Sequence, residues 1–379
     1  MIRKIFRTFL LVLALTSCIT NPTVADERAR RAEANKGDIL IAIVEEEGLA
    51  WQAAQMAVDE INTAGGIAGR MLKVIHEDDG GSETQGRIIA QRLAANPDVV
   101  AVVGHNTSTA SLPASAIYEF AGLLMISSAA TTPRLTQQGF DLVFRNIPSD
   151  AKVGELITDY LAQQNTHNIV ILSEKSAYGR GLGSAIETRA AQIGLNIVDR
   201  VSYQVSDSNF SEVIRDWKML TFDAIVIAGS VPEAAYFIYQ ARQANLSQPI
   251  LGGDGLITDE LWGSGKAVNG TIIVSYFHPD DMQPEAVKFV EAFQKRFGSQ
   301  PDVWAAQEYD AVKVLAYAMQ QAGSSVPEKV AAALHQVNHW PGVTGPHSFD
   351  ERGDVVGKPI VLIMASDKQF SFIHRFSEP

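Results

Sequence analysis

The side chains best suited to binding a small polar molecule follow two apolar runs in the first third of the chain, residues 98–104 and 122–127. Hydroxyl groups and free backbone N–H groups, with few full charges, are the chemistry that binds a small anion such as a carboxylate through hydrogen bonds. The candidate ligand-binding residues are Asn106, Thr107 and Ser108 after the first run, and Ser128, Ala129 and Thr131 after the second.

The two runs read as parallel strands with a helix between them. Their continuous apolar character is typical of strands buried on both faces. The carboxyl ends of such strands share one edge of an open sheet, which is where ligands bind in α/β folds. A helix N-cap for Ser108 and a bare turn for Thr131 remain the structural alternatives.

The rest of the chain predicts an α/β fold in which strand and helix patterns alternate twice, giving two doubly wound parallel-sheet lobes. We expect the chain to cross between the lobes several times around a central cleft. The first lobe should comprise residues 38–149 plus 279–338, and the second 150–278 plus 339–379. Strands are expected at 38–45, 71–78, 98–104, 122–127, 168–174, 222–229, 249–252, 270–276, 359–365 and 369–376.

Composition excludes several classes of function. The chain has 379 residues and a net charge of -12, which argues against a surface for nucleic acid or anionic lipid. The single cysteine, Cys18, leaves no cysteine nucleophile in the body of the chain, and there is no G-x-S-x-G motif. His335 and His339 are four residues apart, but Pro341 ends any helix there. We therefore expect no enzymatic activity, no cofactor and no metal site.

The N-terminus has the pattern of an export signal. Arg3, Lys4 and Arg7 precede a short apolar run that ends in Leu-Thr-Ser-Cys at position 18. This tetrapeptide resembles a bacterial lipobox, so residues 1–18 are expected to be a lipoprotein-type signal with Cys18 as the lipidation site. Cleavage after residues 23–25 is the alternative. Residues 19–37 are polar and are expected to form a flexible tether, which places the protein in the periplasm or on the cell surface.

Several short motifs, in order over about residues 38–365, together resemble the type I periplasmic binding proteins, and most closely the branched-chain amino-acid (Leu/Ile/Val) receptors of ABC importers. They are Ala57-Val58-Asp59-Glu60-Ile61-Asn62 with Gly65-Gly66-Ile67, Val103-Gly104-His105, Ala129-Ala130-Thr131-Thr132-Pro133, Tyr178-Gly179-Arg180-Gly181, Gly253-Asp254-Gly255 and Tyr309-Asp310-Ala311.

The resemblance implies that Ser108, Ala129 and Thr131 hold a ligand's carboxylate and ammonium in the first lobe. It also implies that Tyr178 and Asp254 approach the ligand from the second lobe when the cleft closes. The partners implied are a small-molecule ligand, an amino acid or a related polar solute, and an ABC permease in the membrane. The protein is expected to be a monomer. A tethered sensor that reports ligand to a signalling partner is the alternative, and a surface lipoprotein that has lost its ligand is a third.

Two features depart from the family pattern. The loop after the first strand is short and acidic, with Glu45, Glu46 and Glu47 ahead of Trp51. Trp51 is a further ligand-binding candidate, as an aromatic wall or cation–π partner, and the acidic loop is either a solvated surface or a determinant for a ligand with an extra positive charge. Ser230 stands where the family often has a larger side chain, which predicts a wider pocket.

Overall fold

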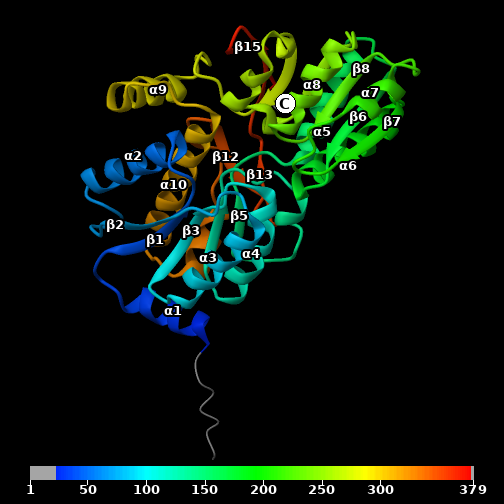
Figure 1. The fold of residues 1–379 in the computed structure, drawn as a ribbon. Helices are drawn as coiled ribbons and strands as arrows, with labels where there is room; N and C mark the ends of the chain where they lie inside the picture. Colours follow the sequence, from blue (N-terminus) through cyan, green and yellow to red (C-terminus); the bar gives the residue numbers. More distant parts are fainter. Residues whose placement is uncertain (1–22, 377–379) are drawn as a thin grey trace, which may run out of the picture.

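The structure is a computed structural model that describes residues 23–376 and contains two mainly parallel sheets, each at the centre of its own lobe (Figure 1). The first sheet has the strand order β2-β1-β3-β4-β5, and the second β15-β14-β10-β9-β8-β6-β7. The strands of the first lobe are β1 (Ile39–Val44), β2 (Leu72–Glu77), β3 (Val99–Gly104), β4 (Leu124–Ser127) and β5 (Val143–Arg145). Those of the second are β6 (Asn168–Glu174), β7 (Asn196–Tyr203), β8 (Ala224–Ala228), β9 (Ile250–Gly252), β10 (Thr271–Ser275), β14 (Ile360–Ser366) and β15 (Gln369–Phe376). The prediction of two doubly wound α/β lobes is confirmed.

The helices cover both faces of the first sheet. Ile41 and Ile43 pack against α2, α10 and α11, whereas Ala42 and Val44 pack against α3 and α4, as the two-residue period of a strand requires. The helices are α1 (Val24–Ala34), α2 (Leu49–Thr63), α3 (Glu83–Ala95), α4 (Ser108–Phe120), α5 (Asp150–Gln163), α6 (Ala177–Ile193), α7 (Ser211–Trp217), α8 (Glu233–Gln243), α9 (Pro284–Phe297), α10 (Val303–Ala322) and α11 (Pro327–Leu334), with 3₁₀ turns η1 (Pro133–Leu135), η2 (Asp254–Leu256) and η3 (Asp259–Val268). None of the helices within residues 23–376 is long and apolar enough to cross a bilayer.

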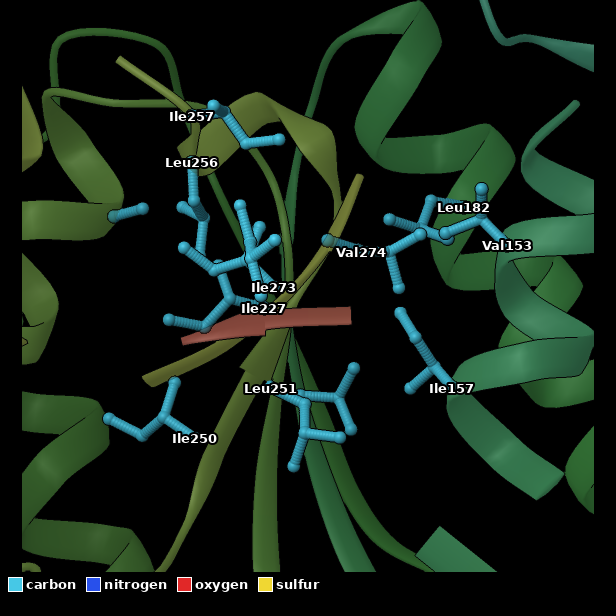
Figure 2. Close-up of a cluster of buried hydrophobic side chains, with 14 of the residues drawn as sticks. Val153, Ile157, Leu182, Ile227, Ile250, Leu251, Leu256, Ile257, Ile273 and Val274 are labelled. Carbon is cyan, nitrogen blue, oxygen red and sulfur yellow. The ribbon is translucent and has the colours of Figure 1, made fainter. Parts of the chain in front are cut away.

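The second sheet is buried in the same manner. Figure 2 shows Leu251 and Val274 turned toward Val153 of α5 and Leu182 of α6, while the alternate residues of the same strands turn to the opposite side of the sheet. Because both faces are buried, the strands are continuously apolar, which is the pattern that made them predictable. The carboxyl ends of β6, β8, β9 and β10 are thereby held in fixed positions.

One segment lies with a different lobe from the one expected. Residues 339–356 were assigned to the second lobe, but they form a small sheet of β11 (Trp340–Gly342), β12 (Gly345–Phe349) and β13 (Val355–Val356) that packs on the first lobe. Phe349 meets Phe144 edge to face at 5.6 Å. The Arg145 guanidinium donates to both oxygens of Asp354, at 3.0 and 2.6 Å. These contacts hold the segment on β5, and only from β14 onward does the chain rejoin the second sheet.

The expectation of a flexible tether over residues 19–37 is wrong for the part that the structure describes. Residues 24–34 form helix α1, and Thr23 and Asp26 close its N-terminus with a capping box. The Arg28 side chain is fully buried and donates to the carbonyls of Val99 at 2.7 Å and Ala94 at 2.7 Å. Its hydrogen bonds tie α1 to the bottom of the first lobe (Figure 1). Residues 1–22, including the signal and Cys18, lie outside the described residues.

The chain crosses between the sheets three times: after β5, after β10 and between β13 and β14. Strands β5 and β7 were not predicted. β5 has only three residues, and β7 is an edge strand whose side chains are mostly half-buried, so neither carries a long apolar run.

Candidate functional site

Four hydrogen bonds fix the loop between β4 and η1, residues 128–132. The Ser127 hydroxyl accepts from the Ala130 N–H at 3.1 Å, and the Ser108 hydroxyl accepts from the Thr132 N–H at 3.2 Å. The Arg145 guanidinium donates to the Thr132 carbonyl at 2.7 Å, and the Asp150 N–H donates to the Thr131 carbonyl at 2.8 Å. Ser108, at the start of α4, therefore lies against the loop that carries Thr131, where the first sheet ends.

The other candidates of the first lobe surround this loop. Thr107 is the N-cap of α4 and its hydroxyl accepts from the Ala110 N–H at 3.2 Å, so the N-cap role that was the alternative for Ser108 belongs to Thr107. Asn106 is half-buried beside it. Ala129 and Ser128 are buried, and the Ser128 hydroxyl has no hydrogen-bond partner. A buried polar atom without a partner is uncommon in native structures and points to a missing partner such as a ligand.

Tyr178 and Asp254, the candidates of the second lobe, form a pair. The Tyr178 hydroxyl donates to Asp254 Oδ1 at 3.0 Å and accepts from the Gly255 N–H at 3.1 Å. Gly253 makes this approach possible, because a Cβ atom there would stand 2.3 Å from the Tyr178 hydroxyl. Burial raises the pKa of Asp254 to about 6, while the hydrogen bond from Tyr178 acts in the opposite direction.

Two residues of this cluster were missed by the sequence analysis, Asp150 and Tyr276. Asp150 is fully buried at the start of α5, and neither of its carboxyl oxygens has a hydrogen-bond partner. Burial raises the pKa of Asp150 well above its usual range, and the neighbouring Asp254 adds to the rise. Tyr276 directly follows β10, and its buried hydroxyl also has no hydrogen-bond partner among residues 23–376. The N-terminal position of Asp150 in a helix concealed it, since an acidic residue there is ordinary.

The cluster combines groups from both lobes. The Thr131 hydroxyl of the first lobe stabilises the ionised form of Asp150. Burial raises the pKa of the Tyr178 and Tyr276 hydroxyls, and the nearby carboxyls of Asp150 and Asp254 raise it further. Two buried carboxyls with no cation hydrogen-bonded to them form a site for a positively charged group.

A hollow of about 650 Å³ opens beside the cluster, between the η1 turn of the first lobe and helices α5 and α6 of the second. Gly181 lines this hollow, and a Cβ atom there would stand 2.4 Å from Asp150 Oδ2. Asp150 therefore packs directly behind Gly181, but neither Asp150 nor any of the predicted ligand-binding residues lines the hollow itself. Its volume is within the range of sites for small molecules.

The structure does not bring Trp51 to this cluster. Its ring stacks on His76 with a centroid separation of 3.8 Å and packs on the core of the first lobe. The residues of the acidic loop differ in exposure, because Glu46 and Glu47 are exposed whereas Glu45 is buried. Ser230 is half-buried, and a Cβ atom at Gly255 would come within 3.0 Å of its hydroxyl, so it lies at the edge of the Tyr178 pair.

With this geometry in place, sequence comparison shows the family. Residues 46–369 match the family described as "Periplasmic binding protein", and the chain belongs to that family. The chain is 31% identical over 306 residues to "Leu/Ile/Val-binding protein homolog 1" of Brucella abortus, which covers 80% of this chain and 81% of that protein. It is 29% identical to a leucine-, isoleucine-, valine-, threonine- and alanine-binding protein of Pseudomonas aeruginosa, over 80% and 81% of the two chains.

Solved structures agree. An ABC transporter substrate-binding protein from Desulfitobacterium hafniense, in complex with Leu, superimposes with a TM-score of 0.80 at 34% identity, covering 89% of this chain and 100% of that one. A leucine-binding protein from Thermotoga maritima gives a TM-score of 0.83 at 27% identity, covering 89% and 98%. The resemblance noted in the sequence, and the two-lobed fold that it implied, are confirmed.

Proposed function

We propose that this protein is the extracytoplasmic solute-binding component of an ABC importer, and that it captures an amino acid between its lobes and delivers it to a membrane permease. The relatives named above bind branched-chain amino acids, and this chain shares their fold over most of its length. Differential affinity for the closed over the open arrangement of the lobes is the general means by which such binding drives a conformational change.

One observation carries the proposal: the buried carboxyls of Asp150 and Asp254 have no cation bound to them, and they adjoin the hydroxyl-rich loop of the first lobe. An α-amino acid matches this arrangement. Its ammonium would lie between Asp254, Asp150 and the Tyr178 hydroxyl. Its carboxylate would accept from the hydroxyls of Ser108 and Thr131 and from N–H groups of the 128–132 loop.

A thermal-shift screen tests this proposal. The protein is heated with amino acids, their amides, polyamines and small carboxylates. A ligand at one hundred times its dissociation constant should stabilise the native state by about 2.7 kcal/mol, which moves the melting temperature by several degrees. A shift with at least one free α-amino acid, and none with its amide, supports the proposal. A panel in which no amino acid shifts the transition contradicts it.

We further propose that lipid on Cys18 holds the protein at the membrane surface. Only residues 19–23 separate Cys18 from the first residue of α1, and five residues span at most about 18 Å. The folded body would therefore stand close to the bilayer. The variant Cys18→Ala should move the protein from the membrane fraction to the aqueous fraction, and an unchanged distribution would contradict the anchor.

A further inference from the structure

A second group of buried carboxyls lies at the cleft, apart from Asp150 and Asp254. Glu308 on α10 is fully buried, and neither of its carboxyl oxygens has a hydrogen-bond partner. Glu45, directly after β1, is 4% exposed, and its side chain accepts only from the adjacent Glu46 N–H, at 3.2 Å. Within residues 23–376 no basic side chain forms an ion pair with either group.

The two glutamates are neighbours. Burial raises the pKa of Glu308 to about 7, and the Ser128 hydroxyl beside it opposes the rise. Burial also raises the pKa of Glu45 well above its usual range, and the charge of Glu308 adds to this. Placing two carboxyls side by side in a buried site is unfavourable unless a positively charged group joins them. The buried Ser128 hydroxyl, which lies beside Glu308, adds a third polar group next to the two carboxyls.

The position of α10 places this group at the same cleft as the first. Trp304 lies one helical turn before Glu308, so the two side chains share a face of α10. Its indole N–H donates to the carbonyl of Ile257 at 3.4 Å, and Ile257 is three residues beyond Asp254 in the second lobe. This face of α10 therefore meets the second lobe next to the segment that carries Asp254.

The 128–132 loop connects the two groups. Ser128 adjoins Glu308, and Thr131, three residues later, adjoins Asp150. Three residues of chain span at most about 11 Å. A single small molecule with two positive charges can therefore reach both groups of carboxyls.

We propose that Glu45, Glu308 and the Ser128 hydroxyl form a second cation site in the cleft, so that the ligand is an α-amino acid with a positively charged side chain. The inference rests on the proposed function for the placement of the α-ammonium and carboxylate. An apolar side chain, as in leucine, would leave both glutamates buried without a partner.

Titration calorimetry of the purified protein with L-lysine, L-ornithine and L-norleucine tests the inference. Norleucine has nearly the shape of lysine without its amine. We expect lysine or ornithine to bind at least ten-fold more tightly than norleucine. Glu308→Gln and Glu45→Gln should each reduce this preference by ten-fold or more. Glu47→Gln makes the same change on an exposed side chain of the same loop and should leave the preference as it is.

The outcomes separate this inference from the proposed function. Tight binding of norleucine or leucine and weak binding of lysine and ornithine overturns the second cation site and leaves the proposed function intact. An unchanged preference in Glu308→Gln also overturns it, provided that the variant melts at or above the temperature of the original protein. Cadaverine, a diamine without a carboxylate, is the further probe. If it binds as tightly as lysine, the second cation site is supported and recognition of the carboxylate is contradicted. If no amino acid binds, both proposals fail.

Discussion

Asp150 and Asp310 are both fully buried carboxyls near the crossings between the lobes, yet their surroundings differ. Asp310 accepts from the Val343 N–H at 2.9 Å and from the Thr344 N–H at 2.8 Å, and the Lys358 ammonium lowers its pKa against the effect of burial. Asp150 accepts no hydrogen bond of normal geometry from residues 23–376, although the nearby Thr131 hydroxyl favours its ionised form. The first carboxyl has its partners within the protein, so it is structural. The second has none among the described residues, and this is the property expected of a group that binds a ligand.

In the structural cluster around Asp310 the Lys358 ammonium is well provided with acceptors, although Asn146 Oδ1 and Gln307 Nε2 beside it have no hydrogen-bond partner among residues 23–376. The ammonium lies 2.7 Å from the Asn146 carbonyl, 3.0 Å from Gln307 Oε1 and 3.0 Å from His347 Nε2. These residues come from three different segments between the lobes, so the cluster holds the crossings together. The difference between the clusters predicts that removing a carboxyl should have opposite consequences for stability at the two places.

The largest effect is expected at the structural cluster. Asp310→Ala leaves two buried N–H groups without their acceptor and removes the negative charge near the Lys358 ammonium, and it should destabilise the protein by about 3–5 kcal/mol. Asp150→Asn replaces a buried carboxyl that has no hydrogen-bond partner among residues 23–376 and should leave the melting temperature of the ligand-free protein unchanged or higher. Thermal unfolding of both variants checks this. A loss of stability in Asp150→Asn equal to that in Asp310→Ala would remove the distinction between the clusters.

The pH dependence of stability sharpens the same comparison. The pKa of Asp254 is about 6 in the folded protein and near 3.8 when exposed, so the folded state binds more protons between these values. Its contribution to stability is present below about pH 4 and is lost as the pH rises through about 6. The change is about 3 kcal/mol at most. Melting temperatures of the ligand-free protein and of Asp254→Asn from pH 4 to 7 measure it, and identical profiles would contradict the pKa shift.

Binding should depend on Asp254 more than on any exposed acidic residue near it. Asp254→Asn removes the charge that faces the ligand's ammonium and should weaken amino-acid binding by about 100-fold. Asp259→Asn is the matched control, since Asp259 is exposed five residues further on and its change should leave the affinity unaltered. Calorimetric titration of both variants measures these affinities. Equal affinities would show that the ligand's ammonium does not bind at Asp254.

A smaller effect is expected from the glycine that admits Tyr178. Gly253→Ala places a methyl group where the Tyr178 hydroxyl now lies, so this side chain must move and binding should weaken by about ten-fold. Gly263→Ala is the control, because nothing lies within 4 Å of the Cβ atom that it would add. If Gly253→Ala binds the ligand with unchanged affinity, Tyr178 does not contribute to the site.

The sequence was sufficient to predict the two lobes because strands buried on both faces are continuously apolar. Short motifs also singled out Ser108, Thr131, Tyr178 and Asp254, which lie at the start of α4, in the 128–132 loop, at the start of α6 and at the start of η2. It did not reveal Asp150, Tyr276 and Glu308. These residues lie at a helix start, at a strand end and within a helix, where their types are ordinary and only the tertiary contacts leave them without partners.

The errors have physical causes as well. Helix α1 looked like a tether because its charged residues hide a single buried contact, that of Arg28. Residues 340–356 were assigned to the second lobe because strands that follow one another in sequence usually share a sheet, whereas Asp354 and Phe349 hold them on the first.

The central claim is that the carboxyls of Asp150 and Asp254 have no positively charged partner among residues 23–376 and gain one when a ligand's ammonium binds. Calorimetry at pH 6 tests it most directly, with the amino acid that stabilises the protein most, in two buffers of different ionisation enthalpy. Asp254, whose pKa is about 6, is about half protonated at that pH. Binding of an ammonium should therefore release at least about half a proton per ligand. Binding heats that do not depend on the buffer would show that no proton leaves, and would contradict the claim.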